Sequence, residues 1–286
     1  MRKFLLLILL LLCSTAQVFA FQQLEKALEK AKEMIKKQQE LPEESVEIED
    51  TLPGLIGAVS KGDINKIKEL IASGVDINEK EKTLGKTALM VTSYLEDDTT
   101  AINIVKLLLS SGADVNRRDS IGRTVLLDSM ARVEPNPELI KILLEAGADV
   151  NVHDGYGDTP FLTAILKKSV NIEILKLFLL AGLDLNTRTQ TGVPVLAIAA
   201  MQDQTDVLDL FFNNGVNVNT RFAPQGESLL FWVAAYGSVK TADWLINRGA
   251  DPELKDLKGY KAVYYAKKSK NRTVEEFLKK VKNKKP

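Results

Sequence analysis

One short phrase recurs along the chain at nearly constant spacing, and this limits the possible folds more than any other feature. Its copies contain the glycines Gly74, Gly112, Gly147, Gly182, Gly215 and Gly249, and LLLSSGADVNRRD at 107–119 is one example. The steps between these glycines are 38, 35, 35, 33 and 34 residues. A period of about 33–35 residues indicates a solenoid built from one supersecondary unit. Because a chemical site is normally built once, the recurrence indicates architecture first.

Each repeat carries a second landmark, a turn glycine followed by a short apolar stretch. Examples are GKTALM (85–90), GRTVLL (122–127) and GDTPFL (157–162). A second apolar stretch follows, such as LIKILL (139–144), and ends at the recurring glycine, which suits a helix C-terminus in the left-handed conformation. Neither predicted helix is long enough to be stable alone, so we expect the units to stack.

The pattern G-x-T-P-L-H-x-A-A followed by L-L-L-x-x-G-A-D-x-N resembles the ankyrin repeat over residues 48–285, with strong matches in GDTPFLTAI and SSGADVN. The resemblance implies an all-α solenoid of stacked helix-turn-helix units with short hairpin-like loops. We place the units at 48–80, 81–117, 118–152, 153–187, 188–221 and 222–254, with a C-terminal cap at 255–286. The chain departs from the pattern at the motif's histidine, so we expect apolar packing at Met90, Leu127, Leu162, Ala197, Phe231 and Tyr264.

The first twenty residues, MRKFLLLILLLLCSTAQVFA, have the layout of a secretory signal peptide, and we predict cleavage after Ala20. An uncleaved membrane anchor would need about twenty apolar residues, and this run is shorter. Cys13, the only cysteine, would leave with the signal, which fits a bacterial envelope protein that is periplasmic or secreted and is not an integral membrane protein. Residues 21–47 are predicted to form an amphipathic helix and an acidic linker. This helix either covers the first repeat, serves as a spacer or binds a partner helix.

The residues that carry chemistry are few. Lys and Arg together number 38, as do Asp and Glu, so no basic excess indicates nucleic acid. His153 is the only histidine, which excludes a multi-histidine metal site or a Ser-His triad. Asp97, Asp98 and Asp128 could pair for acid–base catalysis, but we interpret them as a solvated loop and a helix-turn residue. We predict no catalytic residue, no metal and no cofactor; an enzyme or enzyme subunit with an unrecognised site is the alternative.

Function should then lie on a surface. The resemblance implies a concave face lined by the loop tips and by the exposed end of each first helix. Counting four places before each turn glycine predicts a column of partner-binding residues, Arg118, His153, Arg188, Phe222 and Lys255. Along the neighbouring edge we expect Tyr94, Arg132, Met201 and Tyr236, with Tyr156 beside a turn glycine. Tyr156 could instead pack on the next loop.

This surface should be basic and aromatic, suited to an acidic or extended segment of a partner protein. Binding through the convex face or through the Lys-rich C-terminal tail is the alternative; that tail is either a solvated helix or a contact for anionic lipid. The chain is therefore predicted to be a monomeric, non-catalytic protein-interaction scaffold of the bacterial cell envelope. A secreted effector that binds host proteins is the second interpretation.

Overall fold

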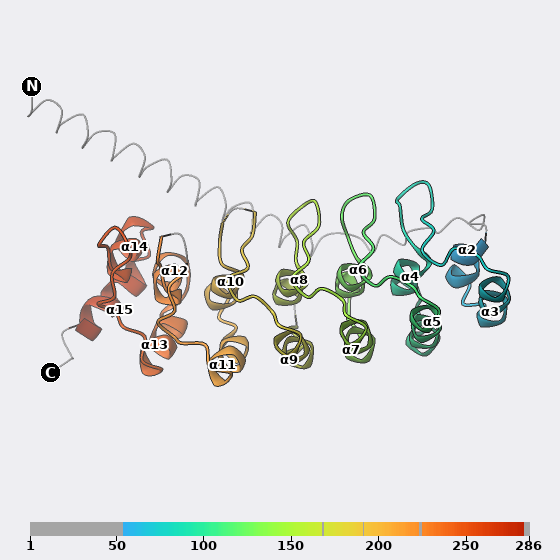
Figure 1. Cartoon of the computed structure of the whole chain (residues 1–286). Coiled ribbons are helices and arrows are strands. Elements are labelled where there is room, and N and C mark those ends of the chain that lie inside the picture. The colour runs from blue at the N-terminus through green and yellow to red at the C-terminus, as the bar shows by residue number, and fades with distance from the viewer. Residues whose placement is uncertain (1–53, 168, 191, 223–224, 283–286) are drawn as a thin grey trace, which may run out of the picture. The chain divides into compact units, whose positions relative to one another are not determined.

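The computed structural model describes residues 54–167, 169–190, 192–222 and 225–282 (Figure 1). They fall into a main unit within Glu47–Thr187 and Pro194–Pro286, and a separate loop, Arg188–Val193, which is described by itself. The predicted signal peptide with its cleavage site, the predicted helix and linker of residues 21–47, and the last four residues lie outside the described part of the chain.

The main unit consists of helix pairs whose members lie in two rows (Figure 1). The first row contains α2 (Gly54–Ser60), α4 (Ala88–Val91) with its 3-10 extension η1 (Thr92–Tyr94), α6 (Val125–Ala131), α8 (Pro160–Leu166), α10 (Val195–Met201), α12 (Leu229–Tyr236) and α14 (Ala262–Lys268). The second row contains α3 (Ile64–Ala72), α5 (Asp98–Ser110), α7 (Pro137–Glu145), α9 (Ile172–Leu180), α11 (Thr205–Asn213), α13 (Val239–Asn247) and α15 (Arg272–Lys282).

No strand occurs in the described residues beyond isolated bridges such as Lys80–Thr87 and Lys255–Lys261 at the base of the loops. The all-α solenoid with hairpin-like loops is therefore confirmed. The unit limits given above remain a prediction.

The helices begin and end where their sequences cap them. Thr87 and Thr159, the threonines of the G-x-T landmark, are N-caps whose side chains accept hydrogen bonds from the amides of Met90 and Leu162. The second helices from α3 to α13 each end before one of the recurring glycines, and all six glycines have positive φ angles, Gly147 at 87° for example. A side chain is strained in that conformation, so the predicted left-handed stop is confirmed.

The core lies between the two rows and contains large apolar side chains. The rings of Phe161 in α8 and Phe211 in α11 lie 5.2 Å apart and join neighbouring units. At the position of the motif's histidine, Met90, Leu127, Leu162, Ala197 and Phe231 are buried, which confirms apolar packing there; Tyr264 is half-buried. Each large side chain buried in this way contributes about 1.5–3 kcal/mol.

Asparagines of the recurring phrase form a ladder between units. The Nδ2 atoms of Asn78, Asn116, Asn151 and Asn219 donate to the carbonyls of Gly112, Gly147, Gly182 and Gly249 at 3.2, 2.8, 3.0 and 3.0 Å. Each Asn Oδ1 accepts the backbone N–H of the aspartate two residues after that glycine. Asn186 differs, because its Nδ2 donates to Asp184 of its own loop at 3.2 Å. The phrase therefore recurs because it builds the same link between successive units.

Candidate protein-binding site

Hairpin-like loops, here called fingers, project from the row of first helices (Figure 1). In the main unit they comprise residues 79–87, 117–124, 152–159, the described residues of 220–228 (220–222 and 225–228), and 253–261. Asp154 shows how a finger is closed: its amide donates to the carbonyl of Asp158 at 3.1 Å, and its Oδ1 accepts the amides of Tyr156 and Asp158. Asp119 and Asp256 make the same bonds in their fingers. These carboxylates are therefore turned inward and are used by the loop itself.

Neighbouring fingers are joined through their backbones. Ser120 N donates to Leu84 O at 2.8 Å, and Gly155 N donates to Ile121 O at 2.7 Å. At Gly85, a Cβ atom would come within 2.7 Å of Ser120 Oγ, so this glycine is needed both for its positive φ and for the close approach. The side chains of successive fingers are thus held in a fixed register.

Two fingers have a longer turn than the others, which overturns part of the predicted column. The residue whose backbone N–H closes the finger is called the inward residue below. It lies three places before the turn glycine at Asp119, Asp154 and Asp256. Phe222 N instead donates to Glu227 O, which closes a turn that is one residue longer. Phe222 therefore occupies the inward position and is only 2% exposed. The prediction that Phe222 binds a partner is wrong, because its ring is buried. Glu81 occupies the inward position of the first finger in the same way, with its amide donating to Lys86 O.

Other members of the predicted column lie on the surface. Arg118 and His153 are exposed and in contact, with Arg118 Nη1 donating to the His153 carbonyl at 3.1 Å. Lys255 is exposed on the last finger. Arg188, in the separately described loop, is half-exposed and donates to Gly192 O of that loop at 2.6 Å.

Apolar side chains lie at the same position of three successive fingers, directly before the turn glycine. Leu84, Ile121 and Tyr156 are 45%, 42% and 62% exposed, and they are called the apolar tips below. Tyr156, one of the predicted residues, therefore does not bury its ring against the next loop. Large exposed apolar side chains grouped in this way are a feature of protein interaction sites.

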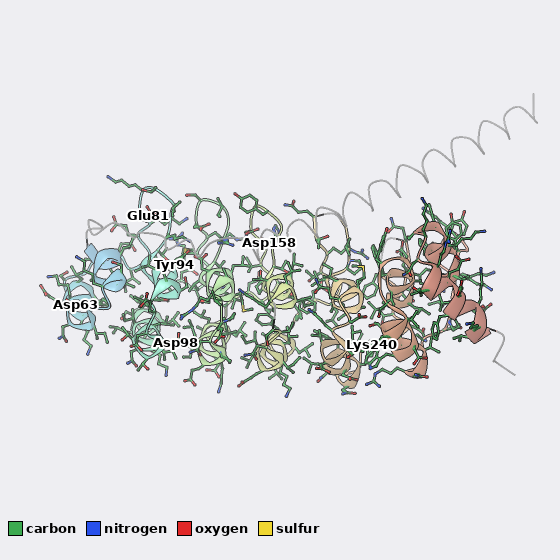
Figure 2. The ribbon with its side chains drawn as sticks, turned by 180° about the vertical axis from the view of Figure 1, so that it is seen from behind. Asp63, Glu81, Tyr94, Asp98, Asp158 and Lys240 are labelled. Atoms are coloured by element: carbon green, nitrogen blue, oxygen red, sulfur yellow. The ribbon has the colours of Figure 1, made fainter. Side chains whose placement is uncertain are left out.

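The predicted helical edge is half-buried. Figure 2 shows Glu81 in the first finger and Tyr94 and Asp158 nearer the row of first helices. Arg132, which follows α6, pairs with Asp98 of α5 at 2.7 Å. Met201 and Tyr236, at the ends of α10 and α12, are also half-buried. Tyr94, Arg132, Met201 and Tyr236 therefore each expose part of their side chain to solvent. Arg132 also links two units.

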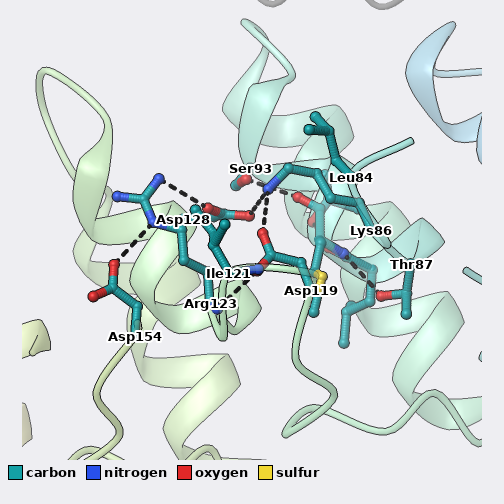
Figure 3. Close-up of polar contacts among 12 residues, drawn as sticks. Leu84, Lys86, Thr87, Ser93, Asp119, Ile121, Arg123, Asp128 and Asp154 are labelled. Carbon is teal, nitrogen blue, oxygen red and sulfur yellow. Dashed lines mark hydrogen bonds and ion pairs between the residues drawn. The ribbon is translucent and has the colours of Figure 1, made fainter. Parts of the chain in front are cut away.

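A chain of buried ion pairs runs beneath the first three fingers (Figure 3). Lys86 Nζ lies 2.7 Å from Asp128 and 3.2 Å from Asp119. Arg123 continues the chain, with contacts of 3.6 Å to Asp128 and 3.4 Å to Asp154. These contacts connect three units. Asp128 lies in the first turn of α6, as expected for a helix-turn residue, and its carboxylate is fully buried.

Burial and charge act against each other in this cluster. Burial disfavours the charged form of Lys86, but the Asp128 carboxylate and Tyr94 together raise the pKa of Lys86 above its ordinary value. Burial raises the pKa of Asp158, and the nearby Asp154 carboxylate raises it further. The Tyr94 ring lies 5.2 Å from Lys86 Nζ. The sequence feature that could have predicted this ion-pair cluster is the presence of Lys86 and Arg123 at the same position of two successive G-x-T landmarks.

Within the described ranges, no three His, Cys, Asp or Glu side chains are grouped so that they could hold a metal ion. The aspartates of the buried cluster are already paired with Lys86 and Arg123. Of the helices placed by the structure, none has the length and apolar character needed to cross a bilayer.

Comparisons with known proteins agree with this architecture. The family model described as ankyrin repeats (3 copies) matches residues 55–154, 127–222, 161–256 and 196–285. The crystal structure of the ankyrin repeat domain of Bcl-3, described as a unique member of the IkappaB protein family, is similar with a TM-score of 0.65. The identity is 24%, over 81% of this chain and 100% of that chain, which shows a shared fold alone. No curated protein sequence matches significantly. Because the family model covers almost all of the described residues, the chain belongs to the ankyrin-repeat family.

Proposed function

We propose that the chain is a non-catalytic scaffold of the bacterial cell envelope that binds a protein partner through its fingers. The observation that carries this proposal is the row of apolar tips, Leu84, Ile121 and Tyr156, on three adjoining fingers. The fold does not need these side chains, since the fingers are closed and joined through backbone atoms and inward carboxylates. An exposed apolar row that a fold does not use favours a binding role.

The envelope location rests on the N-terminal sequence. A basic start, an apolar run and small residues before Phe21 are typical of a cleaved signal peptide. N-terminal sequencing of the protein from fractionated cells tests this, and the mature chain should begin at Phe21. A chain that still begins at Met1, or that carries lipid on Cys13, would refute the soluble periplasmic location. Release into the medium would favour the secreted effector.

The binding role is tested by cross-linking in intact cells followed by capture. A double substitution, Ile121→Ser with Tyr156→Ser, removes the exposed apolar tips and leaves the backbone bonds of the fingers in place. The matched control is Leu180→Ser, because Leu180 is 85% exposed at the end of α9, away from the fingers. A specific partner should be lost with the tip variant and kept with the control. Equal capture of the partner by the unchanged protein, the tip variant and the control would contradict binding through the fingers.

A further inference from the structure

Every finger of the main unit presents a basic side chain or histidine at one equivalent position. This position directly precedes the inward residue. The longer turns of the fingers that contain Glu81 and Phe222 shift it by one place relative to the turn glycine. Its occupants are Lys80, Arg118, His153, Arg221 and Lys255, all of them exposed. These five residues are called the cation column below. Lys80 and Arg221 belong to the column because the backbone hydrogen bonds define the equivalent position; counting from the turn glycine would miss them.

The acidic side chains of the fingers do not neutralise this column. Asp119, Asp154 and Asp256 direct their Oδ1 atoms to backbone amides of their own fingers. Glu81 accepts the amides of Thr83, Leu84 and Lys86, and these hydrogen bonds lower its pKa against the opposing effect of burial. Glu79 is the acid that remains exposed beside Lys80. The finger surface is therefore basic although the whole chain has as many acidic as basic residues.

The apolar tips belong to the same fingers as the first part of the column. In the later fingers, Gln225 and Lys258 take the position that Leu84, Ile121 and Tyr156 hold in the first three, and both are exposed. Leu257, next to Lys258 in the last finger, is one further exposed apolar side chain, at 72%. The surface is thus basic along the five fingers, and most of its apolar side chains are grouped on the first three. A ligand complementary to the first part must carry apolar groups as well as negative charge.

We propose that these fingers dock an extended acidic segment of a protein, with apolar side chains against the tips and carboxylates facing the cation column. An extended chain directs alternate side chains to opposite faces, which lets it present both kinds of group. Of the three tips only Tyr156 has a ring on which a base could stack, and Leu84 and Ile121 are aliphatic, so a polypeptide fits better than a nucleic acid. This inference rests on the proposed role in protein binding and adds the chemistry of the partner.

Fluorescence anisotropy with defined probes tests the inference on the purified chain. The main probe is a labelled peptide of alternating Glu and Leu, about 12 residues long, which spans about 40 Å when extended. Peptides of alternating Glu and Ser and of alternating Lys and Leu, and an oligo-dT of the same length, are the comparison probes. The Glu–Leu peptide should bind most tightly. The Glu–Ser peptide should bind about tenfold more weakly, and binding should weaken further as salt rises from about 50 to 500 mM.

Two variants locate the binding site. The double variant Lys80→Glu with Arg221→Glu should bind the Glu–Leu peptide about tenfold more weakly or worse, since both changes reverse a charge of the column. The matched control, Lys141→Glu with Lys176→Glu, reverses two exposed charges on α7 and α9 and should leave binding unchanged. Circular dichroism melting verifies that each variant folds.

The outcomes separate this inference from the proposed function. Equal weakening by both charge-reversed variants, or no weakening by either, would overturn the cation column as the docking site. Tighter binding of oligo-dT than of the Glu–Leu peptide would also overturn it, in favour of nucleic acid. If a cell-derived protein partner is captured through the apolar tips while the acidic peptide does not bind, the proposed function stands and the acidic segment is refuted.

Discussion

Replacing Asp128 by alanine is expected to destabilise the protein strongly without touching the finger surface. The Asp128 carboxylate is fully buried, accepts a 2.7 Å hydrogen bond from Lys86 and lies 3.6 Å from Arg123. A hydrogen bond to a charged group contributes about 1.5–3 kcal/mol, and removal of one partner of a buried ion pair costs about 3–5 kcal/mol. Lys86 keeps Asp119 at 3.2 Å, so we expect a loss of about 2–3 kcal/mol in the free energy of unfolding.

Two further variants show whether the loss comes from the unpaired charge. Lys86→Met combined with Asp128→Leu removes both charges of the pair and leaves Asp119 with the amides of Ile121 and Arg123, so it should cost clearly less than Asp128→Ala. Asp206→Ala removes an exposed acid in the first turn of α11 and should cost less than about 0.5 kcal/mol.

Urea unfolding followed by circular dichroism measures all three variants through the midpoint and slope of the transition. The reasoning is refuted if Asp128→Ala costs no more than Asp206→Ala. It is also refuted if the double variant is as unstable as the single one, since the loss would then come from volume rather than charge.

Three more predictions test other parts of the fold. Asn116→Ala removes the 2.8 and 2.9 Å bonds to Gly147 and Asp149 and should cost about 1–3 kcal/mol in urea unfolding, whereas Asn186→Ala should cost clearly less; equal losses would contradict the ladder. Gly147→Val should cost about 1–3 kcal/mol by the same assay, from backbone strain alone, because a Cβ atom at this φ of 87° meets nothing within 4 Å; a silent substitution would refute the left-handed stop. Burial and Asp154 raise the pKa of Asp158 in the folded state, so its contribution to stability is present at low pH and is lost as pH rises through that pKa. Asp158→Asn should therefore raise the melting temperature more at about pH 7 than at about pH 4, and an equal gain at both would contradict this sign.

Repetition made the fold predictable from the sequence, but the surface depends on local detail. The recurring glycines and the G-x-T landmarks each occur in several copies, so a misread copy is corrected by the others. The finger register has no such check, because counting from Gly226 cannot reveal the extra residue that turns Phe222 inward. Asp128 was correctly placed on a helix turn, but its burial was not predicted, for a related reason. Its burial depends on Lys86, which lies 42 residues away in sequence.

Asn186 has a consequence for how the array comes apart. In a linear array, each unit is stabilised by itself and by its immediate neighbours, so the weakest junction limits cooperativity. Asn186 bonds to Asp184 of its own loop, so this junction lacks a bridge like the one that Asn151 makes to Gly182, while the Phe161–Phe211 contact still joins the helices. Amides on the two sides of this junction should therefore form separate cooperative blocks in native-state hydrogen exchange, each opening with its own free energy.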